Sequence, residues 1–160
     1  MKLFPFAIQD VQSSQIALLD PSGARTRLFA RDNPDRPNPG DILYVTFKGT
    51  NPPFSGVLLA IRRMQHETSI LLRNEITRIA VEAWYKIYSP NIASIEIVQR
   101  RETYHKRGKR ARRAKLYFMR QPKHDLRSVE GTVRAYLRAK KGSMETSKSG
   151  TGRQIRKRNR

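Results

Sequence analysis

The chain has 160 residues, with 33 Lys and Arg against 13 Asp and Glu, and a formal net charge of +20 at pH 7. That length fits one domain with tails, and charge of that size is typical of proteins with a polyanionic partner. The absence of cysteine excludes disulfides and any Cys-ligated zinc or iron–sulfur site. No apolar run approaches the roughly 18 residues that span a bilayer, so we expect no membrane partner.

The positive charge is concentrated in the second part of the chain. Residues 1–98 hold 11 Lys and Arg against 9 Asp and Glu, whereas residues 99–160 hold 22 against 4. This split favours a near-neutral folded module that carries a nucleic-acid-binding arm over a uniformly basic, histone-like chain.

Residues 1–38 are expected to form an N-terminal extension with a Pro-rich lead-in. Apolar residues between 11 and 19 fit either a short strand or a short helix. Residues 33–40 contain three prolines, which favour an extended, semi-rigid linker. Residues 1–6 are too short and interrupted for the apolar core of a signal peptide. If the protein is organellar, we expect its presequence to be missing from this numbering.

Residues 39–121 are expected to form the folded module. β-Branched and aromatic residues predict six short strands, at 42–47, 54–61, 68–72, within 76–88, at 92–98 and at 115–119. Short strands about ten residues apart, broken by Gly, Pro and Asn and without helices between them, favour a mainly β fold, a small antiparallel barrel. Gly40, Asp41 and Gly56 are interpreted as turn and close-packing positions. Trp84 is interpreted as a core or packed flanking residue rather than an RNA-stacking one.

Residues 122–141 are expected to form a basic amphipathic helix. Apolar residues recur at helical spacing from Leu126 to Leu137, and Asp125 is a candidate N-cap. The remaining residues, 142–160, are small, polar and basic, so we expect a tail that is disordered alone and becomes ordered on RNA.

The basic loop at residues 99–115 is the main functional candidate. Its arginines and lysines can each pair with a phosphate, and arginine also stacks on bases. Tyr104 and His105 lie inside it, although for Tyr104 we favour an incidental contact. A solvated loop is the alternative, as it is for the strand ends at Arg62, Arg63 and Arg73. The candidate rRNA contacts are Arg62, Arg63, Arg73, Arg100, Arg101, Lys106, Arg107, Lys109, Arg110, Arg112, Arg113, Lys115, Arg120, Arg134, Arg138, Lys141, Arg156, Lys157 and Arg158.

Signals for catalysis are weak. His66, His105 and His124 are scattered without metal-ligand spacing, and no carboxylate pair is suggested. The sequence contains neither of the glycine-rich motifs, GxxxxGK[ST] and GxGxxG, that cradle phosphates. We therefore expect no enzyme activity, no metal and no cofactor.

Four segments carry a family resemblance, namely Pro39–Asp41, Phe54–Arg62, Ala80–Pro90 and Arg112–Arg120. In this order they resemble the bacterial-type large-subunit ribosomal protein nineteen family. The resemblance implies an SH3-like β-barrel with extensions, which contacts large-subunit rRNA. It also implies a surface facing the small subunit, a contribution to an intersubunit bridge with small-subunit rRNA, and neighbouring large-subunit proteins three and fourteen. The matched motifs imply rRNA contacts at Arg100, Arg101, Arg112, Arg113, Lys115 and Arg120.

Several features depart from the family pattern. Ser55, Ala80 and Ala83 replace the usual Glu, Gly and Arg, and residues 102–109 stand where the family has a short connection. Both ends also exceed the bacterial length. This divergence favours a mitochondrial protein, located in the matrix on the mitoribosome, over a plastid or bacterial cytoplasmic one.

Together these observations predict a structural constituent of a mitochondrial large ribosomal subunit, a ribonucleoprotein component that binds rRNA during translation. One alternative is a non-ribosomal SH3-like nucleic-acid-binding translation or chromatin factor. Another is an RNA-processing enzyme, for which no residue is a candidate.

Overall fold

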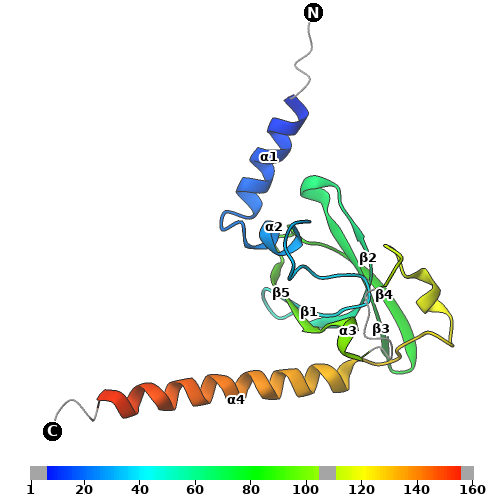
Figure 1. The fold of residues 1–160 in the computed structure, drawn as a ribbon. Helices are drawn as coiled ribbons and strands as arrows, with labels where there is room; N and C mark the ends of the chain where they lie inside the picture. The colour runs from blue at the N-terminus through cyan, green and yellow to red at the C-terminus, as the bar shows by residue number, and fades with distance from the viewer. Residues whose placement is uncertain (1–6, 105–110, 156–160) are drawn as a thin grey trace, which may run out of the picture. The chain divides into compact units, whose positions relative to one another are not determined.

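The computed structural model describes residues 7–104 and 111–155, which belong to two compact units, Met1–Val129 and Glu130–Arg160 (Figure 1). The helices and strands are α1 (Ala7–Leu19), α2 (Ala24–Phe29), β1 (Ile42–Phe47), β2 (Phe54–Arg62), η1 (Gln65–Glu67), β3 (Ser69–Ile76), β4 (Ile79–Lys86), β5 (Ile92–Gln99), α3 (Arg101–Tyr104), η2 (Tyr117–Arg120) and α4 (Glu130–Ile155).

The first unit is built on a five-stranded antiparallel sheet in the order β4-β3-β2-β1-β5. A core cluster of buried apolar side chains includes Leu43, Val45, Leu58, Ile70 and Ile92, whereas others, such as Leu59, Leu71 and Leu116, are buried outside this cluster. Since β3 and β5 both contribute although two strands separate them, the sheet curves around this cluster. The mainly β, antiparallel prediction is confirmed, and the curvature is consistent with a small barrel-like fold.

The N-terminal segment is helical and reaches the core. α1 resolves the choice between strand and helix, and Phe29 at the end of α2 is 6% exposed within the core cluster. Arg25 on α2 donates through Nη1 to the carbonyl oxygens of Ile87 and Ser89, at 2.8 and 2.9 Å. These bonds fasten α2 to the chain between β4 and β5.

Two residues of the predicted turns are fixed by close contacts. The buried carboxylate of Asp41 accepts the N–H of Asn38 through Oδ2 at 2.8 Å and that of Arg101 through Oδ1 at 2.9 Å. It therefore joins the Pro-rich lead-in to the residue after β5. A Cβ at Gly56 would lie 2.8 Å from the Arg73 carbonyl oxygen of β3, so only glycine allows this approach.

The predicted sixth strand at 115–119 is wrong. Lys115 makes only an isolated bridge to Ala60. The register of β2 against β3 shifts at Leu59. The carbonyl oxygen of Leu59 accepts the N–H of Leu116 at 2.9 Å. The chain then turns into η2. Leu116 and Met119 are buried three residues apart, which is the period of a 3-10 helix rather than of a strand.

The C-terminal helix also differs from its predicted bounds. α4 begins at Glu130 rather than at 122, and it continues through Ile155 where we expected an irregular tail after 141. Val129 lies in the first unit, and its N–H donates to the side-chain oxygen of the buried Asn74 at 3.2 Å. Asp125 is not an N-cap, because α4 begins only at Glu130; its carboxylate pairs with Arg73 and accepts the N–H of Arg127.

Candidate nucleic-acid interface

A cationic cleft brings together residues far apart in the sequence. It has a volume of about 350 Å³, and no Asp or Glu is among the described residues that line it. Four of its cations were predicted, and all four side chains are exposed. The lining residues are Arg36, Asn38, Pro39, Ile61, Arg63, Ala111, Arg112, Arg113, Ala114 and Lys115.

The fold explains why these cations converge. Arg63 directly follows β2, and the bridge between Ala60 and Lys115 places residues 111–115 beside that strand end. The lead-in adds Arg36 to the lining. Among residues 7–104 and 111–155, no ion pair involves Arg63, Arg112, Arg113 or Lys115. An anion with several oxygens is therefore the ligand that fits this cleft.

The electrostatics of the cleft can be followed at Arg63. Burial and the neighbouring positive charges of Arg36 and Arg31 lower the pKa of the Arg63 guanidinium. The positive charges thus repel one another in the absence of an anion. Sequence analysis missed Arg36 and Arg31, because the prolines around them indicated only a linker. The positive charge of Arg36 and Arg31 was the one sequence feature that could have marked them as candidate contacts.

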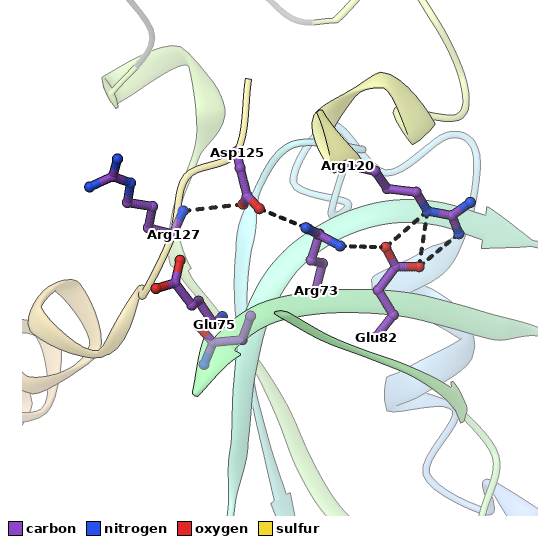
Figure 2. A network of polar contacts seen from close by, with 7 residues as sticks. Arg73, Glu75, Glu82, Arg120, Asp125 and Arg127 are labelled. Atoms are coloured by element: carbon purple, nitrogen blue, oxygen red, sulfur yellow. Dashed lines mark hydrogen bonds and ion pairs between the residues drawn. The ribbon is translucent and has the colours of Figure 1, made fainter. Parts of the chain in front are cut away.

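Two predicted contacts, Arg73 and Arg120, belong to an internal ion-pair network (Figure 2). Arg73 on β3 donates to Glu82 of β4 at 2.9 Å and to Asp125 at 2.6 Å. Arg120 of η2 holds Glu82 with both Nε and Nη2, the latter at 2.7 Å. The Arg73 side chain is only 13% exposed, so we no longer include it among the candidate contacts.

This network perturbs the carboxylates it contains. The hydrogen bond from Arg120 lowers the pKa of Glu82; burial opposes that effect, and the bond from Arg73 adds to it. Burial raises the pKa of Asp125, but hydrogen bonds from Arg73 and from backbone N–H groups outweigh it, so that pKa is also lowered. The network therefore fastens residues 120–125 across β3 and β4.

The two arginines after β5 have different environments. Arg100 lies 3.2 Å from the carboxylate of Asp35 and also donates to that residue's carbonyl oxygen. Arg101 folds its side chain over Gly40, where a Cβ would lie 2.5 Å from Cδ of Arg101. Its Nε and Nη1 are buried and have no hydrogen-bond partner among the residues that the structure describes.

Trp84 is not the core or packed flanking residue that we had predicted. Its side chain is 44% exposed, and the guanidinium carbon of Arg62 lies 5.0 Å from its ring centroid. The strand register explains why the Trp84 ring is exposed. Trp84 pairs with Leu71, and the residues on either side of Leu71, Ile70 and Leu72, point into the core. Because side chains alternate along a strand, Trp84 points away from the core.

In the second unit, Arg134, Arg138 and Lys141 recur at spacings of four and three along α4, so they share one face of the helix. All three are exposed, and Arg134 lies 3.3 Å from the carboxylate of Glu130. The other predicted contacts lie outside the described residues, namely Lys106, Arg107, Lys109, Arg110, Arg156, Lys157 and Arg158.

Two kinds of site are absent from residues 7–104 and 111–155. No group of three or more His, Cys, Asp or Glu could hold a metal ion. No helix there has the length and apolar character needed to cross a bilayer.

Comparison with known proteins identifies the family of this basic protein with its curved antiparallel sheet. The model of the family described as ribosomal protein L19 matches residues 30–132, which is more than half of the chain. The chain belongs to the ribosomal protein L19 family. This confirms the resemblance found in the four sequence segments.

The relatives include fungal and bacterial proteins. A Neurospora crassa protein named large ribosomal subunit protein bL19m is 52% identical over 127 residues, covering 79% of this chain and 46% of the relative. A Schizosaccharomyces pombe protein of the same name is 37% identical, covering 76% and 68%. The Thermus thermophilus protein bL19 is 36% identical over 88 residues, covering 51% and 55%. This chain thus spans less than half the length of the Neurospora relative.

Proposed function

We propose that this protein is a structural constituent of the mitochondrial large ribosomal subunit and binds its rRNA through the cationic cleft. One observation carries the proposal, namely the convergence of Arg36, Arg63, Arg112, Arg113 and Lys115 on a cleft that no described Asp or Glu lines. The two fungal relatives named bL19m support the mitochondrial location. Family membership supports a structural role rather than catalysis.

Backbone phosphates are the groups that the cleft binds. Arginine holds phosphate oxygens bidentately, whereas Lys115 supplies a point charge. Each neutralised phosphate releases condensed counterions, so binding weakens steeply with salt. Such contacts fix the position of a protein on RNA without reading its sequence.

Further contacts extend this interface. The exposed cations of α4 bind phosphates along the helix. By resemblance to the family, the protein has an SH3-like barrel and lies beside large-subunit proteins three and fourteen. On the same ground, it contributes to an intersubunit bridge that contacts small-subunit rRNA.

Incorporation into ribosomes tests the proposal. Replacing Arg112, Arg113 and Lys115 together by Gln removes three charges from the cleft. We expect the variant to enter large subunits at less than about one tenth of the wild-type level, because several phosphate contacts are lost together.

A matched control removes the same charge elsewhere. Lys48, Arg78 and Lys123 are exposed and do not line the cleft. Their triple replacement by Gln should leave incorporation unchanged. Equal incorporation of both triple variants would show that the cleft does not anchor the protein.

A further inference from the structure

The exposed ring of Trp84 lies on a defined surface, which we name the outer face. It is the side of β2, β3 and β4 that points away from the core cluster, and it carries Arg73, Glu82 and Trp84. Trp84 is the only tryptophan in the chain. A large ring that is 44% exposed differs from the usual buried tryptophan, and exposed aromatic rings mark binding surfaces.

Two consecutive arginines, Arg62 and Arg63, connect Trp84 to the cationic cleft. Arg62 lies over the Trp84 ring, with 5.0 Å from guanidinium carbon to ring centroid, and the next residue, Arg63, lines the cleft. Consecutive Cα atoms are about 3.8 Å apart. A short segment of polyanion can therefore reach both the cleft and the ring.

A second aromatic ring repeats this arrangement. Tyr117 is 40% exposed, and the guanidinium carbon of Arg120 lies 4.7 Å from its ring centroid. Arg120 is bound to Glu82, which precedes Trp84 by two residues on the same face of β4. Two residues along a strand span about 7 Å, so both rings belong to the outer face.

The charge of the outer face suits an anion rather than an acidic or neutral protein. Of the two carboxylates that its strands carry, Glu82 is neutralised by ion pairs to Arg73 and Arg120 at 2.9 and 2.7 Å, and Glu75 lies two residues beyond Arg73 at the end of β3 away from Trp84. The cations beside this face, Arg62 and Arg63, have no ion pair to an acid among the described residues. Aromatic rings interleaved with arginines are the chemistry that binds unpaired nucleobases.

We propose that Trp84 and Tyr117 are stacking platforms for unpaired bases of an RNA segment whose phosphates lie in the cationic cleft. The inference rests on the proposed function, and it adds the class of RNA that the protein selects. A duplex can place phosphates in the cleft, but its bases stay stacked inside the helix. An unpaired segment can place phosphates in the cleft and also stack its bases on the two rings. Stacking on either ring tolerates any base, because every base has a π face.

The single tryptophan makes the site directly measurable. The full chain is titrated with an unpaired RNA of about 16 nucleotides and with a duplex of the same length, with Trp84 fluorescence and RNA anisotropy recorded together. We expect the unpaired RNA to quench the fluorescence and the duplex to bind without quenching.

Variants separate stacking from charge. Trp84→Leu should weaken binding of the unpaired RNA about 5- to 100-fold and change duplex binding less than about twofold. Tyr117→Leu should act in the same direction, while Trp84→Phe retains a ring and should lose less. Quenching in the wild-type chain does not depend on any variant folding.

The possible failures are distinguishable. If both RNAs bind without quenching and Trp84→Leu binds like the wild type, the stacking inference is wrong while the proposed function stands. The outer face is then a protein-binding or solvated surface. If neither RNA binds, the proposed function fails as well.

Discussion

Nη2 of Arg73 lies 2.6 Å from Oδ2 of Asp125, although the two residues are 52 positions apart in the chain. The same guanidinium donates to Glu82 at 2.9 Å. One arginine therefore joins β3, β4 and the segment that leaves η2 (Figure 2). This contact holds residues 120–125 on the outer face and so positions Tyr117 and the segment 111–115 that precedes it.

Removing Arg73 should destabilise the first unit. Arg73→Met leaves the Asp125 carboxylate without its guanidinium partner in a site where that side chain is 19% exposed. We expect the free energy of unfolding to fall by about 2 to 3 kcal/mol, measured by urea denaturation. Arg134→Met breaks only an exposed pair on α4 and should cost less than about 0.5 kcal/mol. Equal losses would contradict a structural role for the network.

The same network predicts a pH dependence. The pKa of Glu82 is lowered from its ordinary 4.5, so the unfolded chain binds a proton at a higher pH than the folded one. The stability that Glu82 contributes is complete above pH about 4.5 and is lost as pH falls through its lowered folded pKa. The difference in unfolding free energy between wild type and Glu82→Gln should therefore shrink as pH falls from about 6 to 3. A constant difference would show that the Glu82 charge is irrelevant.

A turn sequence that suits the backbone angles better should stabilise the hairpin of β3 and β4. Ile76 pairs with Ile79, and the two loop residues, Thr77 and Arg78, have φ of 50° and 65°. Asn-Gly is favoured at such positions. Replacing Thr77-Arg78 by Asn-Gly should raise the unfolding free energy by about 0.5 to 1 kcal/mol.

A control for this turn lies in the adjoining strand. Gly has no conformational advantage inside β4, so Ala80→Gly at an exposed position of that strand should instead cost about 0.5 to 1 kcal/mol. A loss of stability in the Asn-Gly variant would mean that the native side chains contribute more than their strain costs.

Gly56 should be intolerant of a side chain. A Cβ there would lie 2.8 Å from the Arg73 carbonyl oxygen, a backbone atom that cannot move aside without displacing β3. Gly56→Ala should lower the unfolding free energy by about 1 to 3 kcal/mol in thermal denaturation. Gly131 on α4 has nothing within 4 Å of such a Cβ, so Gly131→Ala should cause no loss. Similar effects at both sites would rule out close packing as the cause.

The sequence predicted five of the strands because their β-branched residues and turn signals are local. The sequence also predicted that Gly56 is a turn or close-packing position, although not that it packs against Arg73. The segment from Leu116 to Met119 was not, since its apolar residues suit a strand or a turn equally. The pairing with β2 stops after the bond from Leu116 N–H to the Leu59 carbonyl oxygen, where the chain turns into η2, and the local sequence does not show this.

The candidate site was predictable in charge but not in geometry. Arg112, Arg113 and Lys115 stand in a recognisable motif, and they line the cleft. Arg73 looked equivalent to them, but its two acidic partners lie 9 and 52 positions away, and only the folded chain brings them together. Trp84 was expected to be covered because large rings usually are, and its place on the outer face depends on strand register.

The salt dependence of RNA binding tests the cationic cleft most directly. For the full chain, the slope of log K against log salt should be steep, and replacing Arg112, Arg113 and Lys115 by Gln should reduce its magnitude by about 2 to 3. The control replacement of Lys48, Arg78 and Lys123 should change it by less than about 0.5. Equal slopes for the wild type and both variants would contradict the claim that the cleft neutralises backbone phosphates.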